Sequence, residues 1–420
     1  MSKRAAAAKA APPGVVDAAL QAHVDAQLME RGAFAPLEYL IDAGRLIYAD
    51  YESWRRREIE FLDDVLMGRR ENILAEVTQA ASYARAIGLV EQTQEFHSWA
   101  GQAALLSASA DKQVHQLLAA RYAPAQAAPQ MDLFFDNPVV ALTNGIARAL
   151  AARNPGAAQQ QLDRLYAQAP NHSDLASFDR LTAALAHLNH PTADAQAESD
   201  FLLDITPTAK RLLGGDARDL MSPLWHQVAD ALEGHAFSPE TPDLHRSFAL
   251  CQAHDWSAVS ACVLKERGWA EHPALCMRLA QASFYRRRRT EALMAWCHLC
   301  WRAPQQAAEA LDSRNQADSE IAGLWQRFCD LEEEFADADA SAALTAADFP
   351  AFLLLREPAL AESLAADLPP HDTPGEEHYR CVHRWVQARR AGRSEEEIAM
   401  RRQLQAGQVV LFGYLKRTVA

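Results

Sequence analysis

Apolar residues recur at three- and four-residue spacing along most of the chain, which is the pattern of amphipathic helices. In the segment 15–30 one helix face collects the large aliphatic side chains, namely Val16, Leu20, Val24 and Leu28. The same pattern predicts further helices at 36–48, 51–66, 71–88 and 90–107. The segment 409–415 resembles a strand, but its Ala- and Gln-rich lead-in favours a terminal helix. The pattern therefore predicts an all-α fold with negligible strand.

Breaks in composition divide the predicted helices into units. The segment 122–129 is rich in Pro and Ala and poor in charge, which is typical of a linker. Weaker breaks fall at 206–216, 336–347 and 368–375. We expect four parts, which are a disordered tail at 1–14, an N-terminal helical unit at 15–122, a helical-repeat region at 137–335 and a C-terminal helical unit at 348–420.

Evenly spaced prolines indicate an internal repeat. Pro242, Pro273 and Pro304 follow one another at intervals of 31 residues, and proline is favoured in the first turn of a helix. Within the first two intervals a second helix is predicted to begin at Asp255 and at Arg289. Upstream, prolines at 138 and 170 bracket another hairpin, with Asn-Pro-Gly at 154–156 as its turn. The sequence therefore predicts helical hairpins at 138–169, 242–272 and 273–303.

Within this region the segment 273–304 resembles a tetratricopeptide repeat. The resemblance rests on Leu279-Ala280, Ser283-Phe284-Tyr285, Glu291-Ala292-Leu293 and the closing Pro304. The segment 154–170 resembles the second half of another such repeat, so the resemblance covers about 137–304. The Trp-x-x-Leu-Gly motif is missing, and arginines stand where a turn glycine is expected. The resemblance implies an α-solenoid of stacked antiparallel hairpins, whose inner helices line a surface that takes an extended protein segment.

Composition narrows the classes of partner. The chain has 420 residues and a formal net charge of −14, which argues against a general nucleic-acid binder because such proteins cluster cations against phosphate. No run of eighteen apolar residues is present, so we expect no membrane insertion. The N-terminus lacks the apolar core of a secretory signal, and seven cysteines spread through helical segments are typical of reduced thiols. We expect a cytoplasmic protein.

Cys297 and Cys300 lie between two tryptophans and form the one Cys-x-x-Cys pair in the chain. Structural zinc needs four ligands, usually from two such pairs, and no second pair is present. Redox use calls for a cysteine at a helix N-terminus, where its pKa is lowered, whereas this pair falls inside a predicted helix. We therefore predict that both side chains pack in the core, with no metal and no other cofactor, and keep them as weak metal candidates.

Other charged runs have simple explanations. Four arginines at 286–289 could bind phosphate or an acidic peptide, but cations at a helix C-terminus also complement the helix dipole, and we favour that reading. Carboxylate runs such as 332–334 and 395–397 lack a histidine in the His-Glu-x-x-His spacing. Phosphate-binding glycine loops and the Gly-x-Ser-x-Gly motif are absent. The sequence offers no catalytic residues.

These observations favour a non-catalytic helical-repeat protein that binds a protein or peptide partner, as an adaptor, a scaffold or an assembly factor. Two alternatives stay open, which are an enzyme whose active site is assembled from distant residues and a regulator that senses metal or redox state through Cys297 and Cys300. In the helix predicted to start at 273, Arg278, Gln281 and Tyr285 lie on a different face from the leucines at 275 and 279. We predict that these three side chains contact the partner, with the arginine gripping a carboxylate.

Overall fold

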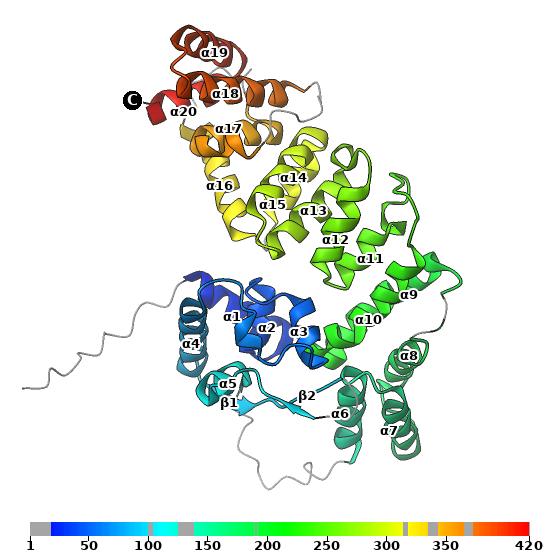
Figure 1. Ribbon diagram of the computed structural model, residues 1–420. Helices are drawn as coiled ribbons and strands as arrows, with labels where there is room; N and C mark the ends of the chain where they lie inside the picture. Colours follow the sequence, from blue (N-terminus) through cyan, green and yellow to red (C-terminus); the bar gives the residue numbers. More distant parts are fainter. Residues whose placement is uncertain are drawn as a thin grey trace, which may run out of the picture. The chain divides into compact units, whose positions relative to one another are not determined.

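The computed structural model describes residues 18–99, 104–124, 138–188, 190, 192–313, 318–334, 343–364 and 373–419. The predicted tail at 1–14 lies outside these residues. The fold is mostly helical, as the sequence predicts, and helices that follow one another in the chain pack side by side (Figure 1). Among the described residues, no helix combines the length and apolar composition needed to cross a membrane.

The chain forms two compact units. The first comprises Met1–His187 and Asp204–Leu220, and the second comprises Leu188–Leu203 and Met221–Ala420. Two helices, α9 (Ala195–Leu213) and α10 (Ala217–Ala231), contribute residues to both units and are joined by the 3₁₀ turn η2 (Gly214–Asp216). Gly214, with a φ of 59°, follows the last residue of α9 and begins η2.

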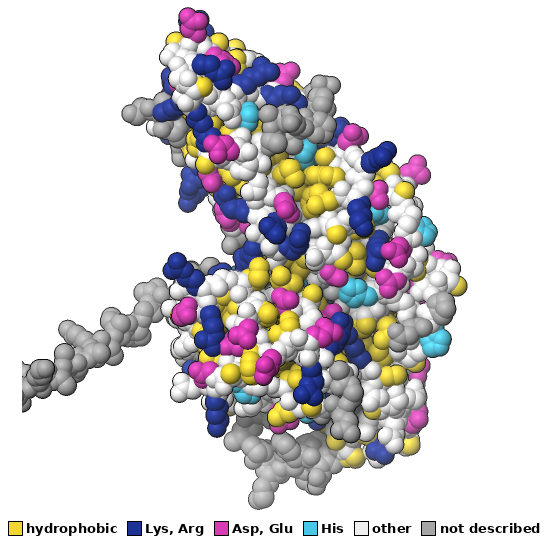
Figure 2. All heavy atoms as spheres, viewed as in Figure 1, with side chains coloured by type: hydrophobic (Ala, Val, Ile, Leu, Met, Phe, Trp, Pro, Cys, Tyr) yellow, Lys and Arg dark blue, Asp and Glu magenta, His cyan; other side chains and the backbone are white. Residues whose placement is uncertain are grey.

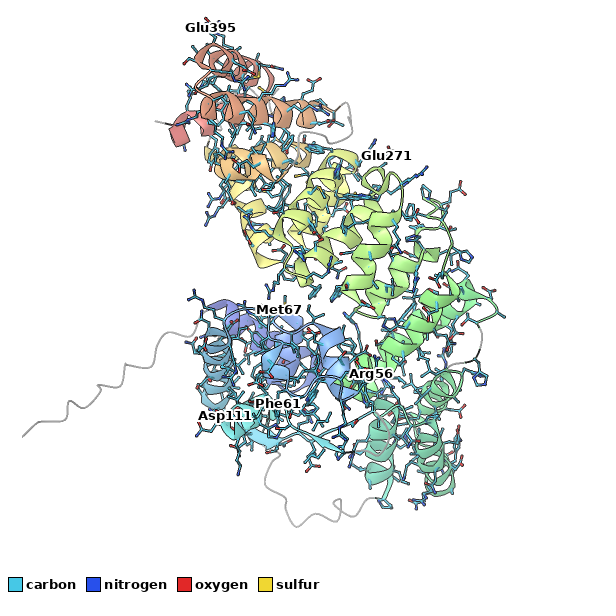
Figure 3. The ribbon with its side chains drawn as sticks, viewed as in Figure 1. Arg56, Phe61, Met67, Asp111, Glu271 and Glu395 are labelled. Carbon is cyan, nitrogen blue, oxygen red and sulfur yellow. The ribbon has the colours of Figure 1, made fainter. Side chains whose placement is uncertain are left out.

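The first unit contains short helices and four short strands. Its helices and 3₁₀ turn are α1 (Ala18–Arg31), α2 (Pro36–Asp42), α3 (Tyr48–Arg55), η1 (Leu62–Asp64), α4 (Arg70–Ala86), α5 (Lys112–Leu118), α6 (Pro138–Ala151), α7 (Pro155–Gln168) and α8 (Leu175–Ala186). The longest of these helices is α4. It buries a stripe of apolar side chains at helical spacing, which consists of Ile73, Val77, Ala80, Ala81 and Ala84. Asp111, labelled in Figure 3, caps α5 by accepting hydrogen bonds from the N–H groups of Gln113 and Val114.

The predicted helix at 90–107 is wrong, because this segment forms strands. β1 (Leu89–Thr93) pairs antiparallel with β4 (Ala120–Pro124), and β2 (Phe96–His97) pairs with β3 (Leu105–Leu106). Gly88, with a φ of 89°, ends α4 and turns the chain into β1. The backbone groups of β1 then find partners 27 or more residues away in β4, which periodicity within the segment cannot reveal.

Three predicted boundaries also need correction. The helix expected at 36–48 ends at Asp42, and Gly44, with a φ of 60°, turns the chain before α3 begins. The helix expected at 51–66 ends at Arg55, because Arg57 adopts a left-handed φ of 65° and the chain then forms η1. The linker expected at 122–129 begins later, since Tyr122 is fully buried in β4 and exchanges two backbone hydrogen bonds with Phe34. Residues 125–129 of that linker lie outside the described residues.

In the described residues of the second unit, all regular secondary structure is helical. After η3 (Pro242–Leu244) its elements are α11 (Arg246–Gln252), α12 (Trp256–Lys265), η4 (Trp269–Glu271), α13 (Pro273–Tyr285), α14 (Arg289–Arg302), α15 (Pro304–Asp312), α16 (Ser319–Glu334), η6 (Ala346–Asp348), α17 (Phe349–Arg356), η7 (Pro358–Glu362), α18 (Pro374–Arg390), α19 (Ser394–Gly407) and α20 (Val409–Val419). The last of these confirms a terminal helix in place of a strand at 409–415. Pro273 and Pro304 occupy first helical positions, as predicted, whereas Pro242 opens η3 instead of α11.

Four helical hairpins share one type of turn. The pairs are α6–α7, α11–α12, α13–α14 and α18–α19, and the helices of each pair pack against one another. One residue in each turn has a left-handed φ between 56° and 67°, and these residues are Arg153, His254, Arg287 and Gly392. The following residue donates its N–H to the carbonyl five positions earlier, at 2.8–3.0 Å. This is the Schellman hydrogen bond, which usually requires glycine, so an arginine or a histidine replaces glycine in three of these turns.

Charge is mixed on the surface that Figure 2 shows. Lys and Arg side chains alternate there with Asp and Glu, and apolar atoms lie between them. Among the described residues drawn on that face, Lys and Arg side chains do not gather into one continuous area of the kind that tracks a phosphate backbone.

Candidate functional site

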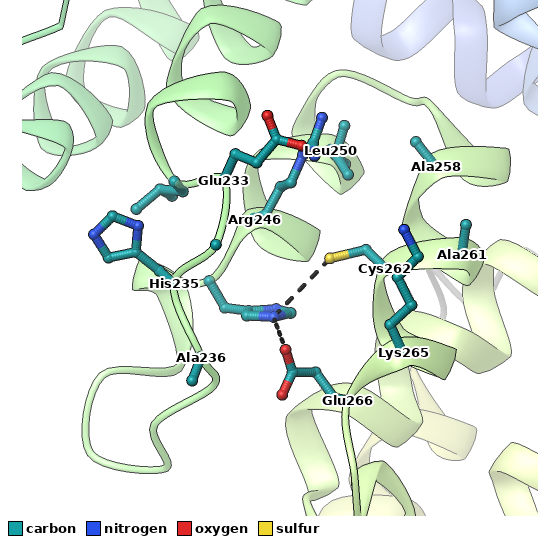
Figure 4. A pocket seen from close by; sticks show the side chains of 13 residues that line it. Glu233, His235, Ala236, Arg246, Leu250, Ala258, Ala261, Cys262, Lys265 and Glu266 are labelled. Carbon is teal, nitrogen blue, oxygen red and sulfur yellow. Dashed lines mark hydrogen bonds and ion pairs between the residues drawn. The ribbon is translucent and has the colours of Figure 1, made fainter.

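A pocket of about 500 Å³ opens in the second unit where the end of α10 meets α11 and α12 (Figure 4). Three segments line it, namely 232–236 after α10, 245–250 in α11 and 258–266 in α12. Its wall includes four residues with little or no side chain, which are Gly234, Ala236, Ala258 and Ala261. Because larger side chains would fill this space, the small residues keep the pocket open. Its volume lies within the range of ligand sites in proteins.

Side-chain caps fix the helices that form the pocket. His245 is the N-cap of α11, and its Nδ1 accepts a hydrogen bond from the N–H of Ser247. Asp255 is the N-cap of α12 and accepts from the N–H of Ala258 at 3.0 Å. These caps satisfy backbone donors that would otherwise lack partners at the helix starts. Two capped helix N-termini therefore hold the backbone of α11 and α12 in place along the pocket wall.

The imidazole of His245 is buried in the pocket lining and contacts three side chains. Its Nδ1 lies 2.8 Å from the Ser247 hydroxyl, and its Nε2 lies 3.3 Å from Glu266 Oε1 and 4.0 Å from Cys262 Sγ. Since Nδ1 accepts from the Ser247 backbone, Nε2 is the nitrogen that carries the proton in the neutral ring and donates to Glu266. Burial lowers the pKa of His245, which keeps the ring neutral.

This arrangement does not activate Cys262 as a nucleophile. A cysteine nucleophile needs a basic nitrogen facing its sulfur, but the nitrogen nearest Cys262 carries a hydrogen and donates it to Glu266. Burial also raises the pKa of Cys262, so the thiol stays protonated. Among the residues described, no group of three or more His, Cys, Asp or Glu side chains is placed to hold a metal ion. The side chains of Ser247 and Glu266 therefore hydrogen-bond to that of His245 within the pocket wall.

Arg278, which the sequence places on the partner-facing side of α13, is buried instead. Its guanidinium donates to the carbonyl oxygen of Pro242 at 2.9 Å, to Ser247 Oγ at 3.1 Å and to Asp243 Oδ1 at 2.8 Å. The expected exposure is wrong because α13 packs against α11, α12 and α14, so two of its faces are covered. Arg278 contacts the pocket wall indirectly, since it donates a hydrogen bond to Ser247, which in turn contacts His245.

The other two predicted partner residues do not gather with Arg278. Gln281 is exposed on α13. Tyr285 is half-buried and stacks on Trp256 of α12, with ring centroids 4.4 Å apart and planes 9° from parallel. None of the three residues lines the pocket. A role for Gln281 and Tyr285 in partner binding stays a prediction.

Cys297 and Cys300 are buried in α14, as expected for packing residues. Burial raises the pKa of Cys297 to about 12 and raises that of Cys300 well above its ordinary value. Thiols with such pKa values are protonated near neutral pH and react slowly. Their placement gives no support to a redox role.

A second cluster of charged groups lies inside the first unit, around Asp219 of α10. Its carboxylate accepts hydrogen bonds from the hydroxyl of Tyr48 at 3.0 Å, the hydroxyl of Tyr51 at 3.3 Å and the guanidinium of Arg55 at 3.2 Å. Pro223 removes the helical N–H that would bond the Asp219 carbonyl, and Arg153 Nε donates to that oxygen at 2.8 Å. These hydrogen bonds fix the start of α10 on α3.

The carboxyl group of Asp219 is expected to titrate near pH 6. Burial raises its pKa to about 6 from 3.8, and the charges of Arg55 and Arg153 offset this only in part. The folded state therefore binds this proton more tightly than the unfolded chain. The stabilisation that comes from binding this proton is fully present below pH 3.8 and is lost as the pH rises to about 6. The check is the carboxyl ¹³C shift followed against pH, and a midpoint below pH 4 would contradict it.

The residues that line the pocket were not predicted from the sequence. His245, Cys262 and Glu266 are 17 and 4 residues apart, and the hairpin α11–α12 brings them together. The available signal was the spacing of Cys262 and Glu266, which puts both side chains on one face of a helix. His245 gave no signal, since histidine is not among the common helix N-caps.

The comparisons with known proteins find no match to this chain, whether with models of protein families, with the sequences of curated proteins or with solved structures. The resemblance of 137–304 to tetratricopeptide repeats therefore stays a prediction. The helical hairpins and their shared type of turn are observed in the structure and do not depend on that resemblance.

Proposed function

We propose that this protein binds a protein or peptide segment through the pocket between α10, α11 and α12, and works as an adaptor, a scaffold or an assembly factor. The hairpins at 242–304 would then stack in the manner of tetratricopeptide repeats, with the pocket at the first of them. The observation that carries this proposal is an open pocket of about 500 Å³ whose reactive groups are engaged in its own wall.

Binding is favoured over catalysis by the state of these groups. His245 donates its Nε2 proton to Glu266 and accepts at Nδ1, so neither nitrogen serves as a base for an incoming molecule. The thiol of Cys262 is held in its protonated form by burial. What the pocket offers to a partner is shape, small side chains and the charged groups at its rim.

Filling the pocket is expected to abolish capture of the partner without unfolding the protein. Ala261 is exposed in α12 and lines the pocket, so a tryptophan at this position occupies the space a partner side chain would use. The test is affinity purification of tagged Ala261→Trp from the native host, with quantitative mass spectrometry against the unmodified chain. We expect at least one stoichiometric companion to fall by about tenfold or more, the loss typical of blocking an interface anchor.

Ser257→Trp is the matched control, because Ser257 is exposed on the same helix and does not line the pocket. This variant should retain the companion, and both variants should keep the melting temperature of the parent. Equal capture by both variants and the parent would contradict the assignment of the pocket. Equal loss in both would mean that a wider face of α12, rather than the pocket, makes the contact.

A further inference from the structure

The charged groups of the pocket are unevenly paired. Arg246 forms an ion pair with Glu233 at 2.9 Å, and Glu266 accepts from His245 at 3.3 Å. The remaining charged residue in the lining, Lys265, has no carboxylate partner among the ion pairs of the described residues. Lys265 is therefore the cation of the lining that forms no ion pair in the described part of the chain, while the carboxylate of Glu266 faces a neutral imidazole.

Lys265 lies in the last turn of α12 and its side chain is exposed. Figure 4 shows it on the same wall of the pocket as Cys262. Burial raises the pKa of Cys262, the charge of Arg246 lowers it, that of Glu266 raises it and that of Lys265 lowers it. Both cations and the carboxylate of Glu266 therefore act electrostatically at the position of that thiol.

Arg246 offers a second cationic group. Its carboxylate partners Asp230 and Glu233 are 73% and 71% exposed, so these pairs are weakly held and easily exchanged. Its Nε is buried and has no hydrogen-bond acceptor among the described residues. A buried guanidinium N–H without an acceptor is costly, and an incoming anion would satisfy it.

We propose that the pocket binds an anionic side chain of the protein partner, with Lys265 as its ion-pair partner and Arg246 as a second donor that exchanges Glu233 for the ligand. This inference rests on the proposed function and names the chemistry that the pocket recognises. The anionic side chain is a carboxylate or a phosphorylated serine, since both present oxygen acceptors to these cations. The short side chains of Ala258 and Ala261 leave room for it between α11 and α12.

Under this proposal Glu233 competes with the ligand for Arg246. The proposal therefore predicts whether each substitution raises or lowers the affinity for an anion. Glu233→Gln removes the competing charge and should strengthen binding of an anion by about threefold, as expected for one exposed charge at a rim. Lys265→Glu reverses the unpaired cation and should weaken the same binding by about tenfold or more. Both positions are exposed, so neither change is expected to alter the fold.

The probes are N-acetylglutamate amide and N-acetylphosphoserine amide, with N-acetylglutamine amide as the neutral control. Binding is followed in the full chain by the ¹³C-methyl resonances of alanine, because Ala258 and Ala261 lie in the pocket wall. We expect these two methyl signals to shift with one or both anionic probes and not with the glutamine probe. The stronger anionic probe identifies the source of the negative charge.

Arg267→Glu is the matched control for Lys265→Glu, because Arg267 is exposed two residues further along and does not line the pocket. It changes the net charge equally and should leave the affinity within about twofold. Equal weakening by both variants, or equal shifts with the glutamine probe, would overturn the proposal. If Ala261→Trp no longer captures the companion protein but the anionic probes bind no better than the glutamine probe, the proposed function is supported and the proposal of an anionic ligand is wrong.

Discussion

Replacing Asp219 with alanine is expected to lower the free energy of unfolding of the first unit by about 3–5 kcal/mol, the cost of leaving a buried charge without its partner. The side chains of Asp219 and Arg55 are 5% and 9% exposed, so water cannot replace the lost carboxylate. The hydroxyls of Tyr48 and Tyr51 lose their acceptor at the same time. Urea denaturation, with hydrogen exchange of α3 read by mass spectrometry, measures the effect and locates it.

Asp204→Ala is the matched control in the same unit. Asp204 pairs with Arg180, but its side chain is 66% exposed, and such surface pairs contribute between 0 and about 1 kcal/mol. A loss at Asp219 no larger than the loss at Asp204 would contradict the structural role given to the buried cluster.

Replacing Gly375 with alanine is expected to destabilise the second unit by about 3 kcal/mol or more, at the upper end of overpacking changes. A Cβ built at Gly375 would lie 2.2 Å from the carbonyl oxygen of Ala347 and 2.4 Å from its carbonyl carbon. These are backbone atoms in η6, so the clash is relieved only if α18 and η6 move apart. Thermal unfolding of the variant and the parent measures the difference.

Gly323→Ala supplies the comparison for this change. Gly323 lies inside α16, and a Cβ there meets no atom within 4 Å. Alanine is favoured over glycine in helices by about 1 kcal/mol, so this variant should be neutral or more stable. A similar fall in stability for both variants would show that Gly375 is not held against Ala347.

The helical hairpins could be predicted because their signals are local. Pro273 and Pro304 open helices at first positions, and Asn154 and Asp255 cap the helices that follow them. The strands could not be predicted in the same way. Their stability comes from pairing between segments far apart in the chain, such as Glu91 opposite Tyr122, and the segment 90–107 alone has a helical distribution of apolar residues.

The candidate site was harder to predict for a related reason. The apolar pattern of α13 predicts one buried side and so places Arg278 on an exposed face, whereas neighbouring helices bury two sides of α13. His245 and Glu266 meet only after the chain turns at His254, so their spacing carries no motif. Sequence patterns identify which helix faces are apolar, but which polar residues meet depends on how the hairpin closes.

The central claim is that a partner segment enters the pocket between α10, α11 and α12, and site-specific photo-cross-linking tests it most directly. A benzophenone amino acid replaces Ala261 in one variant and Ser257 in another, and each is irradiated in the native host. The account predicts that position 261 gives a cross-linked partner peptide containing an acidic or phosphorylated residue, and that position 257 gives little. Cross-linking that is equal at both positions, or found at position 257 alone, would contradict it.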